Sequence, residues 1–146
     1  METGAITLDD KEFLEQITRH EGYRRSAYQD SKGYWTIGIG RLIDKKLNGG
    51  LTVEEAQYLL QNDLDRCAKD LNEKLPWWSE LSENRQYVLL NMCFNLGIAK
   101  LLGFKNTLAM IKAGNYEGAA KGMLNSLWAK QVGKRATELA EQMRKG

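Results

Sequence analysis

The sequence predicts an α+β fold that is mostly helical, with one small sheet near the N-terminus. Helix-favouring residues dominate the 146-residue chain, and Pro76 is its only proline. Against this background, the aromatic and β-branched run Tyr34–Ile37 favours a strand. The length is that of one domain, and 42% apolar with 27% charged residues is typical of a folded protein and argues against disorder.

The first helix is expected from about Asp10 to Glu21, with Asp9 or Asp10 as its cap and Gly22 as its stop. Glu21 falls in the last turn, where the helix dipole favours the protonated form of a carboxyl group. A general acid needs that bias. The buried stripe of this helix is expected to consist of Phe13, Leu14 and Ile17.

A small sheet is expected next. The segment Asp30–Gly33 has the residues of a type I turn and precedes the strand at Tyr34–Ile37. Because side chains alternate along a strand, Thr36 shares a face with Tyr34. The residues from Leu42 to Leu51 are expected to form further turn or edge structure.

The rest of the chain is expected to be helical. Thr52–Glu55 is a capping box that opens a long helix ending before Pro76. The apolar stripe of that helix is Ala56, Leu60, Leu64, Cys67 and Leu71. Ser82 can cap the next helix, which Gly97 ends, and further helices are expected over 107–113, 115–128 and 134–144.

Charge and cysteine content limit the function classes. The net charge of +2 is too small to argue for nucleic acid, although residues 121–146 carry six basic and two acidic residues. This basic end suits an anionic polymer or a membrane surface, or it is simply a solvated helix face. Cys67 and Cys93 are expected to be buried free thiols, and the spacing of His20 and the cysteines predicts no metal site or cofactor.

Glu21, Asp30 and Thr36 are the residues that point to chemistry. Cleaving a glycosidic bond needs one carboxyl group to protonate the leaving oxygen and a second group to handle water. The helix end, the turn and the strand could bring the three residues around one cleft. Each also has a structural reading, because Asp30 can start a turn and Thr36 suits any strand.

The same residues carry a resemblance to the phage-type lysozymes. It rests on Glu21 with Gly22, on Asp30 nine residues later, and on the run Gly33–Gly40. It continues, in the order of the family, through residues 91–97, 103–108 and 126–128 and through Arg135 with Ala136.

The resemblance implies a two-lobed lysozyme-like fold with a small antiparallel sheet in the N-terminal lobe and a helical C-terminal lobe. The N-terminal lobe would span about 10–60, the linking helix about 53–74 and the helical lobe about 77–146. The implied activity is endo-acting muramidase: inverting hydrolysis of the β-1,4 bond between N-acetylmuramic acid and N-acetylglucosamine in peptidoglycan. Glu21 would be the general acid, and Asp30 and Thr36 would position the attacking water.

The family's substrate contacts carry over to Leu42, Phe94 and Thr107. Leu42 and Phe94 could equally be core residues, and Thr107 could be a helix cap. At one further contact position the family has Asn, and this chain has Gly122. That hydrogen bond to substrate is therefore expected to be missing.

Five supporting residues are also expected. Arg41 stands where family members often have His, and we expect it to pair with Asp63 on the long helix. Arg135 is expected to contact Glu21. Asn95 and Trp128 are expected to support this layer by packing and hydrogen bonding.

These expectations describe a monomeric enzyme made in the host bacterial cytoplasm, which reaches the cell wall after a separate protein permeabilises the membrane. Met1–Leu8 lacks a signal-peptide pattern, and no apolar run is long enough to span a membrane. The alternatives are an inactive wall-binding protein, a lytic transglycosylase, and a membrane-active role of the basic C-terminal helix on an anionic lipid or outer-membrane surface. The apolar stripe of that helix would be Ala136, Leu139, Ala140 and Met143.

Overall fold

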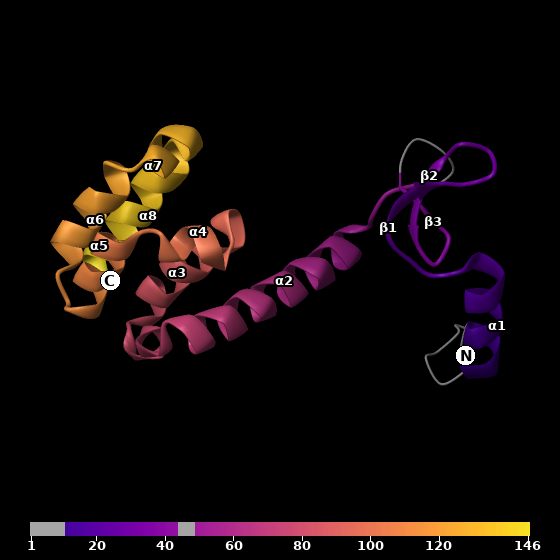
Figure 1. Ribbon diagram of the computed structural model, residues 1–146, viewed down its shortest axis with the longest axis horizontal. Coiled ribbons are helices and arrows are strands. Elements are labelled where there is room, and N and C mark those ends of the chain that lie inside the picture. The colour runs from indigo at the N-terminus through magenta and orange to yellow at the C-terminus, as the bar shows by residue number, and fades with distance from the viewer. Residues whose placement is uncertain (1–10, 44–48) are drawn as a thin grey trace, which may run out of the picture. The chain divides into compact units, whose positions relative to one another are not determined.

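The computed structural model describes residues 11–43 and 49–146. In those residues it has eight α-helices, one 3-10 helix and three short strands, which confirms the mostly helical α+β fold (Figure 1). The chain divides inside its longest helix into two compact units, which we call the sheet unit (1–57) and the helical unit (58–146). Asp9 and Asp10, expected to cap the first helix, lie outside the described residues.

The sheet unit begins with helix α1, Lys11–Glu21. Gly22 ends the helix as expected: its φ is +73°, and its N–H donates to the carbonyl of Thr18 over 2.7 Å. Strands β1 (Arg24–Gln29), β2 (Trp35–Gly38) and β3 (Arg41–Leu42) follow as an antiparallel sheet in sequence order. The turn between β1 and β2 closes where the Gly33 N–H donates to the Asp30 carbonyl over 2.9 Å.

The apolar stripe expected on α1 is not buried. Phe13 is 45% exposed and Ile17 is 38% exposed, while Leu14 is half-buried. The described part of the sheet unit offers one three-stranded sheet and the first residues of the next helix, and these do not cover the stripe. Helical periodicity in the sequence therefore predicted which residues form the apolar face of α1, but the prediction that this face is buried was wrong.

Helix α2, Val53–Lys74, starts at the predicted capping box. The Thr52 N–H donates to Glu55 Oε1 over 2.9 Å, and the Glu55 N–H donates to Thr52 Oγ1 over 3.1 Å. Burial along its apolar stripe increases toward the C-terminal end, from exposed Leu60 to fully buried Leu71. A 3-10 helix, Pro76–Glu80, follows.

The remaining helices belong to the helical unit. They are α3 (Glu83–Leu96), α4 (Ile98–Leu102), α5 (Lys105–Lys112), α6 (Tyr116–Leu124), α7 (Leu127–Val132) and α8 (Lys134–Lys145). Ser82 caps α3 as expected, since its hydroxyl accepts from the Arg85 N–H. The helix expected over 115–128 is two helices, because Ser126 leaves helical geometry and its hydroxyl accepts the Ala129 N–H as the cap of α7.

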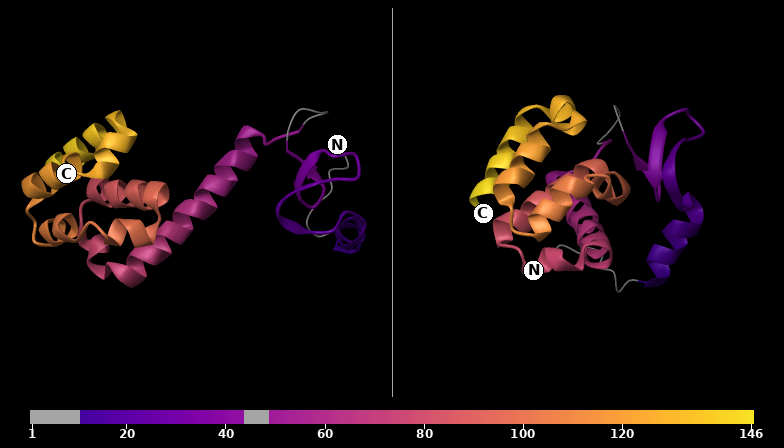
Figure 2. Two further views of the ribbon diagram at one scale, coloured as in Figure 1. Left: turned by 45° about the horizontal axis from the view of Figure 1, so that its top comes forward. Right: turned by 60° about the vertical axis from the view of Figure 1, so that its left-hand side comes forward.

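The core of the helical unit is formed mainly by apolar side chains of α3, α5, α6 and α8 and by the end of α2, with single residues from the 3-10 helix, α4 and α7. These helices pack together around the C-terminal end of α2 (Figure 2). Arg85 of α3 joins this core to the end of α8. Its Nε donates to the Met143 carbonyl over 2.7 Å, and its Nη2 donates to the Arg144 carbonyl over 3.0 Å. The guanidinium carbon lies 3.4 Å from the centre of the Tyr116 ring. One side chain thus donates hydrogen bonds to two carbonyl groups at the end of α8, where the helix has no donors for its last carbonyl groups.

Helix α8 packs its apolar stripe inward. Its four stripe residues are all buried: Ala136, Leu139, Ala140 and Met143. Among the described residues, no helix combines the length and the apolar character that crossing a membrane requires.

Candidate active site

Glu21 ends α1 with its carboxyl group against the turn that joins β2 to β3. A Cβ atom built on Gly40 would lie 2.6 Å from Glu21 Oε2 and 2.9 Å from Glu21 Cδ. The φ of Gly40 is +73°, so both the backbone conformation and the contact favour glycine here. The missing side chain of Gly40 therefore makes the space in which the Glu21 carboxyl group lies.

Asp30 is held by the turn that it starts. Its Oδ1 atom accepts the backbone N–H groups of Lys32 and Tyr34, each over 2.9 Å. Its own N–H donates to the Tyr34 carbonyl over 2.8 Å. Since none of the described residues donates to Oδ2, the carboxyl group has one oxygen fixed by the backbone and one available to a ligand or water.

Thr36 lies in the middle strand, β2, and is 3% exposed. Its Oγ1 donates to the Tyr34 carbonyl over 3.1 Å. Thr36 pairs with Tyr28 on β1 and with Leu42 on β3, so the three side chains lie on one face of the sheet. Leu42, an expected substrate contact, is thus a direct neighbour of Thr36.

Arg41 has a partner that was not expected. Its Nη1 donates to Glu55 Oε1 over 2.8 Å and to the Gly50 carbonyl over 3.0 Å, and its Nη2 also pairs with Glu55. Asp63 pairs with Arg66 one turn along α2. Arg41 and Asp63 belong to different units, so their expected pair stays a prediction. Within the sheet unit Arg41 pairs with Glu55, because the capping box fixes that carboxylate at the start of α2.

This arrangement strongly perturbs Glu55. The hydrogen bond from Arg41, followed by the Thr52 N–H, lowers the pKa of Glu55 from 4.5 to about 2. Glu55 is therefore ionised throughout the neutral range. Its surroundings make it a structural anion and leave it no role as a proton donor there.

The other supporting residues lie in the helical unit. Arg135 donates from Nε to Asn91 Oδ1 over 2.9 Å, and Trp128 donates from Nε1 to Asn95 Oδ1 over 2.8 Å. The contact between Asn95 and Trp128 joins α3 to α7. Because Glu21 and Arg135 belong to different units, their contact stays a prediction.

The two remaining substrate-contact candidates line separate pockets of the helical unit. Phe94, 43% exposed, borders a pocket of about 660 Å³ beside α2. Thr107, 6% exposed, borders a pocket of about 670 Å³ that also includes Trp128 and Gly122. Thr107 is the third residue of α5, so it does not cap that helix.

Gly122 explains how Thr107 fits. A Cβ atom at position 122 would lie 2.6 Å from Thr107 Oγ1. The hydroxyl group of Thr107 therefore fills the place that a side chain at 122 would need. The loss of Asn at this position and the presence of Thr at 107 form one coupled feature of the pocket.

Two residues in these sites were missed by sequence reasoning: Glu55 as the partner of Arg41, and Tyr28 beside Thr36. The Arg24 guanidinium carbon lies 4.9 Å from the centre of the Tyr28 ring, which places a cation next to the Thr36 face. The glycines at the end of this strand, Gly38 and Gly40, already indicate close approach in the sequence, and the Glu21 side chain approaches Gly40. The partner of Arg41 depends on tertiary placement and has no such local signal.

The sheet unit thus combines a carboxyl group at a helix end, a turn carboxylate with one open oxygen, and a buried hydroxyl group on the middle strand. Such a set can donate a proton at one point and hold a water molecule at another. It has the composition of an acid and base pair for cleaving an acetal bond.

Comparison with known proteins agrees with this chemistry. A family model described as phage lysozyme matches residues 18–145. The chain is similar to the pre-baseplate central spike protein Gp5 of Enterobacteria phage T4, with 33% identity over 92% of this chain. It spans only 28% of that spike protein.

Two relatives of similar length are matched over most of both chains. A probable T4-type lysozyme of Dictyostelium discoideum is 29% identical over 86% of this chain and 89% of its own length. An endolysin of Salmonella phage P22 is 30% identical over 80% of each chain.

Proposed function

The chain belongs to the phage lysozyme family, and from this premise we propose that it hydrolyses the β-1,4 bond between N-acetylmuramic acid and N-acetylglucosamine with inversion at the anomeric carbon. Family membership confirms the resemblance predicted from the sequence and makes the protein a lysozyme, a peptidoglycan-degrading enzyme. The observation that carries the finer proposal is the position of the Glu21 carboxyl group against Gly40, on the turn that follows the Thr36 strand.

Glu21 is the proposed general acid. It is the last residue of α1, and its carboxyl group lies against the turn that joins β2 to β3. In the reaction it transfers its proton to the glycosidic oxygen as the bond to the anomeric carbon breaks. The departing sugar leaves as an alcohol, and Glu21 is left as a carboxylate.

Asp30 and Thr36 are the proposed holders of the attacking water. Thr36 Oγ1 gives its only proton to the Tyr34 carbonyl, so this oxygen can accept a hydrogen bond from water. Asp30 has one oxygen occupied by two backbone N–H groups, and its Oδ2 atom can accept a hydrogen bond from the second O–H group of the same water. The water oxygen then attacks the anomeric carbon while Asp30 takes the released proton.

This division of work sets a distance between the acids. An inverting enzyme needs room for water between the sugar and its base, so the two carboxyl groups should lie roughly 6.5–9.5 Å apart. NMR of the first product tests the mechanism. A product of α configuration supports the proposal, and retention of β configuration would exclude it.

Glu21→Gln is the direct test of the acid. We expect this variant to fold normally and to lose lysis of permeabilised Gram-negative cells. Glu15→Gln, the same substitution on the exposed side of the same helix, is the matched control and should keep full activity. Full activity of Glu21→Gln would exclude Glu21 as the acid.

Lytic transglycosylase chemistry is the alternative reaction on the same bond. It closes an anhydro ring in the product and uses no positioned water, so Asp30 and Thr36 favour hydrolysis. Mass spectrometry of the released muropeptides separates the two reactions, because anhydro products lack one water. Anhydro products as the main species would overturn the proposal.

We further propose that the enzyme serves host cell lysis and phage release. It would act as a monomer on peptidoglycan after a separate protein permeabilises the cytoplasmic membrane. Release of enzyme from host cells should then depend on that second protein. Lysis by the enzyme expressed alone in the host cytoplasm would contradict this order of events.

A membrane-active role of the C-terminal helix is not favoured by the packing of α8. The stripe that would enter a lipid surface is buried, and Arg144 and Lys145 both pair with Glu141. Killing of intact cells by Glu21→Gln protein would support the membrane role. Complete loss of killing would leave the enzyme activity alone.

A further inference from the structure

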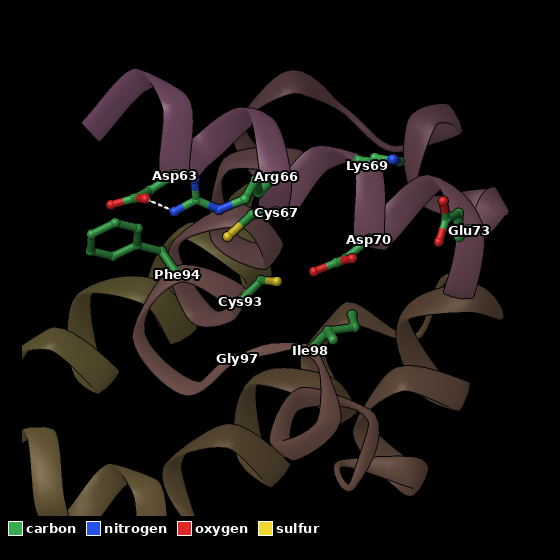
Figure 3. Close-up of a pocket in the computed structure, with 10 residues that line it drawn as sticks. All are labelled: Asp63, Arg66, Cys67, Lys69, Asp70, Glu73, Cys93, Phe94, Gly97 and Ile98. Atoms are coloured by element: carbon green, nitrogen blue, oxygen red, sulfur yellow. Dashed lines mark hydrogen bonds and ion pairs between the residues drawn. The ribbon is translucent and has the colours of Figure 1, made fainter. Parts of the chain in front are cut away.

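The helical unit holds two thiols in one pocket. Cys67 comes from α2 and Cys93 from α3, and both border the pocket of about 660 Å³ (Figure 3). Neither is in a disulfide. The candidate catalytic residues lie in the sheet unit, so lysozyme chemistry gives this pair no role.

The two thiols differ in exposure. Cys67 is half-buried on the wall of the pocket, whereas Cys93 is only 2% exposed. Burial is the main cause that raises the pKa of Cys93 to about 12, and a hydrogen bond with Cys67 is the second. Cys67 packs against the buried core cluster that contains Cys93, and both residues line the same pocket. The expectation of two buried thiols is confirmed for Cys93 and only partly for Cys67.

The pocket suits a small charged thiol reagent. Its volume far exceeds that of a single side chain, and it opens beside Arg66 and Lys69 on the same helix as Cys67. Three acids, Asp63, Asp70 and Glu73, line it as well. A lining of both signs can pair with the amino groups and the carboxylates of a zwitterionic peptide-like disulfide such as oxidised glutathione. Asp63 partly neutralises Arg66, so Lys69 is the cation left for such a ligand.

We propose that Cys67 and Cys93 form a dithiol site that is oxidised by low-molecular-weight disulfides to an intramolecular disulfide joining α2 to α3. The Cys67 thiolate attacks one sulfur of the small disulfide, forming a mixed disulfide and releasing one small thiol. Cys93 then loses its proton and attacks Cys67 Sγ, which releases the second small thiol. The small disulfide takes up the two electrons and two protons that the cysteines lose.

The disulfide would be a covalent cross-link inside the helical unit. The bond would close a loop of roughly 26 residues and restrict the unfolded chain accordingly. Its timing rests on the proposed function: the thiols stay reduced in the cytosol and oxidise once the enzyme is outside the membrane, where disulfides persist. The enzyme would therefore be more stable where it works than where it is made.

The test uses the full chain incubated with oxidised glutathione, followed by intact mass and thermal unfolding. We expect the mass to fall by two hydrogen atoms, Tm to rise by roughly 10 °C, and a dithiol reductant to reverse both changes. Cys93→Ser should stop at a glutathione adduct on Cys67, and Cys67→Ser should not react.

Several results would overturn the proposal: two free thiols in the wild-type protein after incubation, a mixed disulfide as the final product, or a disulfide between two chains. If either variant fails to fold, the wild-type mass alone decides. The test does not measure cell-wall lysis. A negative result would therefore reject the dithiol proposal without affecting the proposed enzyme function.

Discussion

Gly40→Ala should damage catalysis far more than stability. The new methyl group would be 2.6 Å from Glu21 Oε2, whereas ordinary contacts begin at 3.4 Å. The carboxyl group must therefore move by about 0.8 Å, which the end of a flexible side chain can do without disturbing the fold. The backbone adds a cost of its own, because alanine at a φ of +73° costs about 1–2 kcal/mol.

The catalytic effect follows from that displacement. A misplacement of about 1 Å in a catalytic group can reduce the rate by on the order of 100-fold, which is about 2.7 kcal/mol in the barrier. We therefore expect Gly40→Ala to lose on the order of 100-fold in kcat/KM on soluble peptidoglycan fragments, with Tm lowered by only a few degrees. Substrate binding through the helical unit should be little changed.

Gly38→Ala is the matched control. Gly38 has a φ of +68°, close to that of Gly40, but a Cβ atom there would meet nothing within 4 Å. It therefore reports the effect of backbone strain without contact with Glu21. Both variants should lose the same stability, and Gly40→Ala should lose much more activity. Equal losses of activity in the two variants would refute the claim that Gly40 positions the acid.

Three further substitutions test the energetics of the fold. Arg85→Met should lower stability by about 2–3 kcal/mol in urea unfolding, because it removes two charge-assisted hydrogen bonds and a cation–π contact; a loss below about 0.5 kcal/mol would contradict this. Since its pKa is about 2 instead of 4.5, Glu55 stabilises the fold above pH 4.5, and this contribution disappears as the pH falls toward 2. Thermal unfolding of Glu55→Gln should therefore depend less on pH in that range, and an unchanged pH dependence would exclude the effect. Gly122→Asn should cost about 1–3 kcal/mol by displacing Thr107, unless Thr107→Ala is introduced with it.

Local signals in the sequence predicted much of the fold. The reciprocal capping box Thr52–Glu55, the Ser82 cap and the stop at Gly22 all formed as expected, because each depends on a few neighbouring residues. The break at Ser126 is a local signal that was overlooked. The expectation of one helix over 115–128 leaves out the ability of Ser126 to cap a helix.

Burial and pairing were harder to predict because they depend on residues distant in sequence. Periodicity placed Phe13 and Ile17 on the apolar face of α1, yet nothing in that period says what covers the face. Arg41 could reach several acids on α2 by sequence alone. Which acid it binds depends on where β3 ends, and the structure selects Glu55.

The carboxylate of Glu55 has a consequence for protein engineering. It accepts hydrogen bonds from Arg41, the first residue of β3, and from Thr52, the residue before α2, and Arg41 also donates to the Gly50 carbonyl. Both ends of the intervening connection are thus fastened independently of its length, and lengthening a fastened loop adds only slowly to its closure entropy. The connection between β3 and α2 is therefore a suitable place to insert a peptide tag or a binding loop, provided that Arg41 and Glu55 are kept.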